Sequence, residues 1–211
     1  MPPFNPPLTL LLVDDHFVFR AGLKAVLSLR KDFEVVAEAG DGEQALDAFR
    51  RHEPGMTLMD LRLPDATGIE TLRRIRQEFP AARVLMLTTY DGDEDIHRAL
   101  ESGACGYLLK SVPGPELLRA IEAAALGKRY IPPEVQRRLE ERATYGELTD
   151  REREVLPFVA KGLTNKDIAR ILKFTEFTAK AHVRSLLAKL GAADRTELVS
   201  IAVQRGLVHL E

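Results

Sequence analysis

The feature that most constrains the fold is an alternation, over the first two thirds of the chain, of short apolar runs with amphipathic stretches. The runs are nearly continuous in apolar character, as strands covered on both faces of a sheet require. They predict strands at 8–13, 33–39, 56–59, 83–88 and 106–109. The stretches between and after them predict helices at 18–29, 42–52, 69–79, 94–102 and 115–126. Strands and helices that alternate in this way predict a doubly wound α/β fold with a five-stranded parallel sheet.

Polar side chains stand where four of these strands end. Asp14 and Asp15 follow the first strand, Asp60 the third and Lys110 the fifth, and Thr88 ends the fourth. Because the carboxyl ends of parallel strands share one edge of the sheet, where α/β proteins place their ligands, we expect these groups to lie close together. Three carboxylates there repel one another, which favours a hard divalent cation with oxygen ligands, such as Mg²⁺.

This set of groups suits phosphoryl transfer to a carboxylate. Asp60 would be the nucleophile, while a cation, the Lys110 ammonium and the Thr88 hydroxyl stabilise the phosphoryl oxygens. A lone Asp after a strand is more often only a turn residue, so the prediction depends on the whole cluster. An aspartate-nucleophile phosphohydrolase would use the same edge, but we expect such an enzyme to carry its nucleophile after the first strand.

The last third of the chain carries only helix signals. Thr149, Thr164, Thr175 and Asp194 each stand where an N-cap precedes a helical pattern, and Gly191 ends the third pattern. Four short helices, the second and third joined by a brief turn, predict an all-α helix-turn-helix domain.

The third of these helices has a polar face of the kind that reads DNA. Lys180, Ala181 and Arg184 lie outside its apolar stripe, and the segment 161–195 holds 8 basic against 3 acidic residues. Lys and Arg match guanine edges and phosphates, and a small Ala suits a thymine methyl. The alternative is an exposed helix made soluble by charge.

Composition narrows the setting of the protein. The single cysteine, Cys105, excludes an internal disulfide and a zinc site built of cysteines, which favours a reducing cytoplasm. The apolar run at 8–13 is too short for a signal core or a membrane span, and we expect no membrane partner.

Segments of different composition suggest the domain limits. We expect a disordered Pro-rich leader at 1–7, an α/β domain at 8–127, a partly helical linker at 128–146 and the helical domain at 147–211. Two residues break local rules in the last domain. Pro157 should kink the first helix or move its start, and Lys173 stands in the helix-turn-helix turn, where a positive φ would be strained.

The strand-end motifs resemble the receiver domain of bacterial two-component response regulators. They are VDDH at 13–16, MDLRLPDATG at 59–68, LTT at 87–89 and GYLLK at 106–110. The resemblance implies that a sensor histidine kinase phosphorylates Asp60. It also implies that Mg²⁺ is held by Asp14, Asp15, Asp60 and the backbone carbonyl of Arg62, and that Thr88, Tyr107 and Lys110 bind the phosphoryl group or act as switch residues.

The helical domain resembles the LuxR-type DNA-binding domain, through LTDREREVLPFVAKGLTNKDIARIL, TAKAHVRSLLAKLG and DRTEL. Joined to a receiver, it resembles the NarL/FixJ class of transcriptional regulators. The resemblance implies base contacts by Lys180, Ala181 and Arg184, and backbone contacts by Asn165, Lys166 and Thr178. It implies a homodimer on activation, joined through Asp194, Leu198, Ile201 and Ala202, and therefore an inverted-repeat operator in double-stranded DNA. A DNA-binding regulator whose receiver works without phosphorylation is the main alternative.

Overall fold

The computed structural model describes residues 4, 6–90, 92–142 and 146–209. The chain forms two compact units, one of residues 1–90 and 96–135 and the other of residues 91–95 and 136–211. Most of the predicted leader and the end of the predicted linker helix, at residues 1–3, 5 and 143–145, lie outside the described residues.

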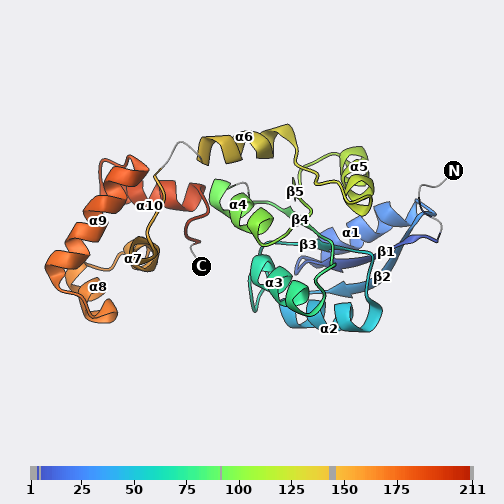
Figure 1. The fold of residues 1–211 in the computed structure, drawn as a ribbon, viewed down its shortest axis with the longest axis horizontal. Coiled ribbons are helices and arrows are strands. Elements are labelled where there is room, and N and C mark those ends of the chain that lie inside the picture. The colour runs from blue at the N-terminus through green and yellow to red at the C-terminus, as the bar shows by residue number, and fades with distance from the viewer. Residues whose placement is uncertain (1–3, 5, 91, 143–145, 210–211) are drawn as a thin grey trace. The chain divides into compact units, whose positions relative to one another are not determined.

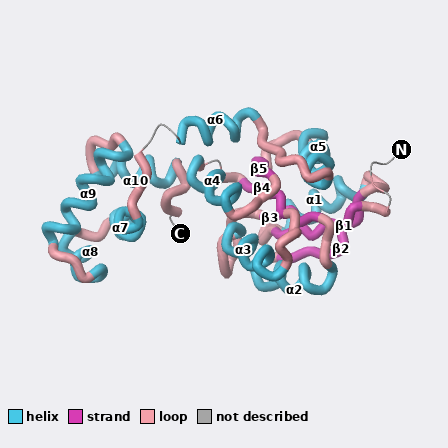
Figure 2. The backbone as a smooth tube through the Cα atoms, in the orientation of Figure 1, coloured by secondary structure: helices cyan, strands magenta, loops and turns pink. Residues whose placement is uncertain are grey.

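The first unit is built on the predicted five-stranded parallel sheet (Figure 2). Its strands are β1 (Leu8–Val13), β2 (Phe33–Ala39), β3 (Met56–Met59), β4 (Val84–Thr88) and β5 (Gly106–Leu109), in the order β2-β1-β3-β4-β5. Every residue of β3 and β4 is buried, as their continuous apolar sequence requires. Strand order reverses at β1, which lies between β2 and β3, so the carboxyl ends of β1 and β3 flank a topological switch point.

Helices cover both faces of this sheet (Figure 1). They are α1 (Phe17–Ser28), α2 (Gly42–His52), α3 (Gly68–Glu78), α4 (Asp93–Glu101) and α5 (Gly114–Ala125). One core joins α1 and α5 to the strand residues Leu10, Leu12, Leu85 and Leu87. Helices α2 and α3 lie on the opposite face (Figure 1). The predicted α/β class is confirmed, and every predicted bound lies within one residue of the observed one.

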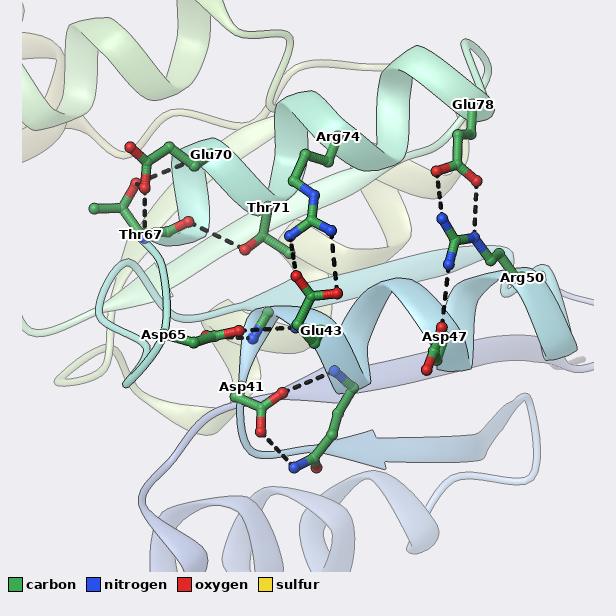
Figure 3. A network of polar contacts seen from close by, with 12 residues as sticks. Asp41, Glu43, Asp47, Arg50, Asp65, Thr67, Glu70, Thr71, Arg74 and Glu78 are labelled. Atoms are coloured by element: carbon green, nitrogen blue, oxygen red, sulfur yellow. Dashed lines mark hydrogen bonds and ion pairs between the residues drawn. The ribbon is translucent and has the colours of Figure 1, made fainter.

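Polar contacts join α2 to α3 and to the loop that follows β3 (Figure 3). Arg74 Nη1 lies 2.7 Å from Glu43 Oε1, and Arg50 Nη2 lies 2.7 Å from Glu78 Oε1. Exposed ion pairs of this kind each contribute little to stability. Asp65 has a more specific effect, because its carboxylate accepts hydrogen bonds from the backbone N–H groups of Gly42 at 2.7 Å and Glu43 at 3.0 Å. Asp65 therefore fixes the loop after Asp60 to the N-terminus of α2.

One residue of the predicted leader and one of the predicted linker contact this unit. The ring of Phe4, in the predicted disordered leader, lies 6.1 Å from the ring of Phe33. Tyr130, in the predicted linker, forms a parallel bridge with Gly106 of β5 and donates its N–H to Cys105 at 3.0 Å. A side chain at Gly106 would place its Cβ 2.5 Å from the Tyr130 carbonyl oxygen. Helix α6 (Pro133–Arg142) follows.

The second unit contains the four predicted helices, which are α7 (Asp150–Ala160), α8 (Asn165–Leu172), α9 (Glu176–Leu190) and α10 (Arg195–Gln204). The side chains of Thr149, Thr164, Thr175 and Asp194 cap them as predicted. Apolar residues of all four helices form one core. In the described parts of the chain, no helix is long and apolar enough to cross a membrane.

The two irregular positions of this unit behave differently. Pro157 lies inside α7, and the predicted shift of the helix start is wrong, because the capping box at Thr149 still opens the helix at Asp150. Lys173 adopts φ 56°, so the turn before α9 does use a left-handed residue, as suspected from the sequence. A non-glycine residue there costs about 1 kcal/mol.

Candidate functional site

The carboxyl ends of β1, β3 and β5 bring three predicted site residues into direct contact. The Lys110 ammonium lies 2.7 Å from Asp14 Oδ2 and 2.6 Å from Asp60 Oδ2. All three side chains are buried or nearly so, with exposed fractions of 9% or less. A single cation thus joins two carboxylates that would otherwise repel each other.

Asp60 is held in place by its own loop. Its backbone N–H donates to Val13 at 2.8 Å, and its Oδ1 accepts the N–H of Leu61 at 2.7 Å. The chain then turns so sharply that a Cβ at Gly68 would lie 2.0 Å from the Asp60 carbonyl oxygen. Glycine is therefore required at the start of α3 for this loop to close over β3.

A third carboxylate, from Asp15, and the His16 side chain join the acidic cluster. Asp14, Asp15, His16 and Asp60 each offer a ligand atom, and these atoms lie within 4.8 Å of one another. His16 Nδ1 is 2.7 Å from Asp15 Oδ1, and the backbone N–H of His16 donates to Asp14 Oδ1 at 2.9 Å. A donor set dominated by carboxylate oxygens fits a hard divalent cation. His16 is not among the predicted site residues, although the motif VDDH places it next to both aspartates.

The predicted switch residues meet at the backbone of Tyr90. Thr88 is fully buried, and its hydroxyl accepts the Tyr90 N–H at 3.3 Å. Tyr107 is also fully buried and donates its hydroxyl to the Tyr90 carbonyl at 2.8 Å. The Arg62 guanidinium carbon lies 5.0 Å from the centre of the Tyr90 ring. Tyr90 thus links Thr88, Tyr107 and the loop after Asp60.

The electrostatics of the cluster keep Lys110 charged. Burial lowers the pKa of the Lys110 ammonium, but hydrogen bonds and charge attraction from Asp14 and Asp60 outweigh burial, so this pKa lies above its ordinary value. The site therefore presents a fixed positive charge beside Asp60 throughout the physiological pH range.

The second unit presents the predicted reading face of α9. Lys180, Ala181 and Arg184 are exposed, while Ala179 and Val183 are buried against the core. Three residues are predicted to lie near the DNA backbone, and of these Lys166 is exposed. The side-chain oxygen of Asn165 accepts a hydrogen bond from Arg195 at 3.3 Å. The backbone N–H of Thr178 donates to the Thr175 hydroxyl oxygen at 3.1 Å. Both Asn165 and Thr178 are half-buried.

Two polar residues of α9 that lie outside its apolar stripe serve the domain itself. Lys189 Nζ and Ser185 Oγ each lie 2.7 Å from the carboxylate of Glu152 in α7, and Glu152 is only 3% exposed. Burial raises the pKa of Glu152, but the bonds from Lys189, Ser185 and Thr149 outweigh burial and hold this pKa at about 2.

Two of the four predicted dimer residues need correction. Leu198 and Ala202 are fully buried because they fill the core of the unit, Ile201 is half-buried, and Asp194 caps the helix. The side chains of Leu198 and Ala202 therefore present no surface to a partner. The exposed residues of α10 include Thr196, Ser200 and Val203, which lie in line along the helix.

Both halves of the chain match known families. Residues 10–122 match the response regulator receiver domain, and residues 146–202 match the bacterial regulatory proteins of the luxR family. The response regulator protein VraR of Staphylococcus aureus is 36% identical over 207 residues, which cover 96% of this chain and 99% of VraR.

Solved structures agree with these matches. The response regulator ChrA of a heme-sensing two-component system is 36% identical, with a TM-score of 0.58 over 96% of this chain and 99% of ChrA. RcsB of Salmonella enterica serovar Typhimurium, solved bound to a promoter with the phosphomimetic BeF3⁻, is 25% identical, with a TM-score of 0.73 over 93% of this chain and 98% of RcsB. The chain therefore belongs to the two-component response regulators that carry a LuxR-type DNA-binding domain and regulate transcription.

Proposed function

We propose that this response regulator is phosphorylated on Asp60 by a sensor histidine kinase, and that phosphorylation promotes dimerisation and DNA binding. The observation that carries the proposal is the pairing of Lys110 with both Asp14 and Asp60 at one edge of the sheet. A buried nucleophilic carboxylate beside a fixed cation suits an incoming phosphoryl group.

In this mechanism an Asp60 carboxylate oxygen attacks the phosphorus atom carried by the kinase histidine. A bond between this oxygen and phosphorus forms, which makes Asp60 an acyl phosphate, and the bond from phosphorus to the histidine nitrogen breaks. Lys110 moves from the two carboxylates to a phosphoryl oxygen and neutralises its charge. Asp14, Asp15, Asp60 and the Arg62 carbonyl would hold Mg²⁺, which supplies further positive charge to the phosphoryl oxygens when it is bound. In autodephosphorylation, water attacks the phosphorus atom, the bond from phosphorus to the Asp60 oxygen breaks, and inorganic phosphate leaves.

Tyr90 offers a physical route from the phosphoryl group to the switch. If the Thr88 hydroxyl turns to a phosphoryl oxygen, it gives up the bond from the Tyr90 N–H. The Tyr107 hydroxyl is bonded to the carbonyl of the same residue, so a shift of Tyr90 changes the surroundings of Tyr107. Phosphorylation would thereby bias an equilibrium between two arrangements of this region.

On the DNA side, Lys180, Ala181 and Arg184 would face bases, and Lys166, Asn165 and Thr178 would approach the backbone. That RcsB, a structural neighbour, was solved bound to a promoter supports DNA binding by the similar chain here. Because the core contains Leu198 and Ala202, the proposed dimer contact keeps Asp194 and Ile201 and adds the exposed residues Thr196, Ser200 and Val203. A two-fold dimer implies an inverted-repeat operator.

Intact-mass measurement tests the phosphorylation step. The parent and Asp60→Ala are incubated with a small-molecule phosphodonor, with and without Mg²⁺. We expect one added phosphoryl group in the parent, dependent on Mg²⁺, and none in the variant. No adduct in the parent, with DNA binding retained, would favour a regulator with a phosphorylation-independent receiver. Repeated turnover of small phosphoesters would instead favour a phosphohydrolase.

A further inference from the structure

A large apolar side chain lies in an unexpected place on the reading helix α9. Phe177, the second residue of the helix, is 82% exposed. Single exposed apolar residues are common on protein surfaces, so exposure alone assigns no role to this phenyl ring. Its position on the helix is what makes it informative.

Phe177 lies in line with the proposed base-reading residues. At 3.6 residues per turn, the exposed residues Phe177, Lys180, Ala181 and Arg184 follow the spacing i, i+3, i+4 and i+7 and fall within an arc roughly 100° wide. The buried residues Ala179, Val183, Leu186 and Leu190 form the opposite face. The neighbouring acidic residue, Glu176, lies to the side of the exposed stripe.

The N-terminal end of this stripe is also the end that enters the major groove deepest in helix-turn-helix proteins, where the first residues of the recognition helix meet base edges. The Thr175 side chain caps this end by accepting the Thr178 N–H at 3.1 Å, so the backbone that carries Phe177 is well fixed. A phenyl ring offers no hydrogen bond to a guanine or cytosine edge. It makes apolar contact with the C5 methyl of thymine, the one apolar group that the major groove presents.

We propose that Phe177 reads a thymine methyl and thereby selects an A·T base pair at one position of each operator half-site. This inference rests on the proposed DNA binding through α9 and adds a specificity-determining residue to it. It also divides the stripe by chemistry, with an apolar contact at its N-terminal end and cationic contacts at Lys180 and Arg184.

Replacement of thymine by deoxyuridine tests the proposal, because uracil lacks the methyl but keeps the same base-pairing edge. A duplex is first selected from a random library with the phosphodonor-treated full-length parent. Each thymine is then replaced singly, and the Kd is measured for the parent, Phe177→Ala and Phe17→Ala. Phe17 is a matched control, since it is 70% exposed but belongs to α1 of the other compact unit.

We expect one thymine in each half-site whose replacement weakens binding of the parent and of Phe17→Ala about fourfold, the effect of one buried methyl group. Phe177→Ala should bind the unmodified duplex more weakly than the parent protein does, and its Kd should not change when that thymine is replaced. A thymine that contacts Ala181 instead can be distinguished, because its replacement would still weaken binding of Phe177→Ala. If no replacement depends on Phe177 while the parent still selects a duplex, this inference is overturned and the proposed function stands. If the parent selects no duplex at all, both are overturned.

Discussion

At the scale of single residues, the loop that carries Asp60 leaves no room for a side chain at Gly68. A Cβ there would meet the Asp60 carbonyl oxygen at 2.0 Å and the Met86 side chain at 3.1 Å. We therefore expect Gly68→Ala to lower the free energy of unfolding by about 3 kcal/mol. Urea unfolding of the full chain measures the loss, and hydrogen exchange of the β3 amides assigns it to the first unit. Gly114→Ala is the control, because nothing lies within 4 Å of its Cβ. Equal stability of the two variants would contradict the packing described.

Also at the residue scale, we predict that Arg62 and Tyr90 slow the loss of the phosphoryl group. Their stacked side chains, 5.0 Å apart from guanidinium carbon to ring centre, lie just beyond Asp60 and Thr88, where they could restrict the access of water to an acyl phosphate. We expect Arg62→Ala and Tyr90→Ala each to lose the phosphoryl group severalfold faster than the parent, as measured by intact mass over time. Arg50→Ala, which removes an exposed ion pair with Glu78, should match the parent. Equal rates in all four proteins would remove the proposed shielding.

At the scale of elements, the buried Glu152 joins α7 to α9. Its pKa of about 2 lies below its ordinary value of 4.5, so it contributes stability that is present above pH 4.5 and is lost as pH falls towards 2. We expect Glu152→Gln, which can still cap α7, to cost on the order of 2–3 kcal/mol at neutral pH and to flatten the acid dependence in this window. Unfolding of the second unit as a function of pH measures both effects. Glu154→Gln, which alters only an exposed pair with Arg151, should keep the parent's profile.

The same elements show what sequence patterns can and cannot predict. Helices and strands were predictable because their apolar periods and caps are local, as at Thr149 and Thr175. The ends of the strands also placed Asp14, Asp60 and Lys110 at one edge. Contacts between distant segments carried no such signal. For this reason the sequence carries no signal for the bond from Lys189 to Glu152, and the prediction that Leu198 and Ala202 form a dimer surface is wrong because both fill the core.

At the scale of the whole molecule, we propose that phosphorylation and DNA binding are two linked equilibria. A ligand shifts such an equilibrium only as far as its affinities for the two states differ, and coupling between two sites is typically worth 5- to 150-fold in affinity. The sequence motifs predicted both sites, because each is built from residues close together in sequence or at adjacent strand ends. The coupling between the sites depends on how the whole chain responds, which no motif encodes.

The central claim is that a phosphoryl group on Asp60 strengthens DNA binding. The most direct measurement is the Kd of the full chain for a duplex selected from a random library, with and without phosphodonor and Mg²⁺, for the parent and Asp60→Ala. We predict that the donor lowers the Kd of the parent by about tenfold or more and leaves Asp60→Ala unchanged. An unchanged Kd in a parent shown by mass to be phosphorylated, or an equal gain in Asp60→Ala, would contradict the account.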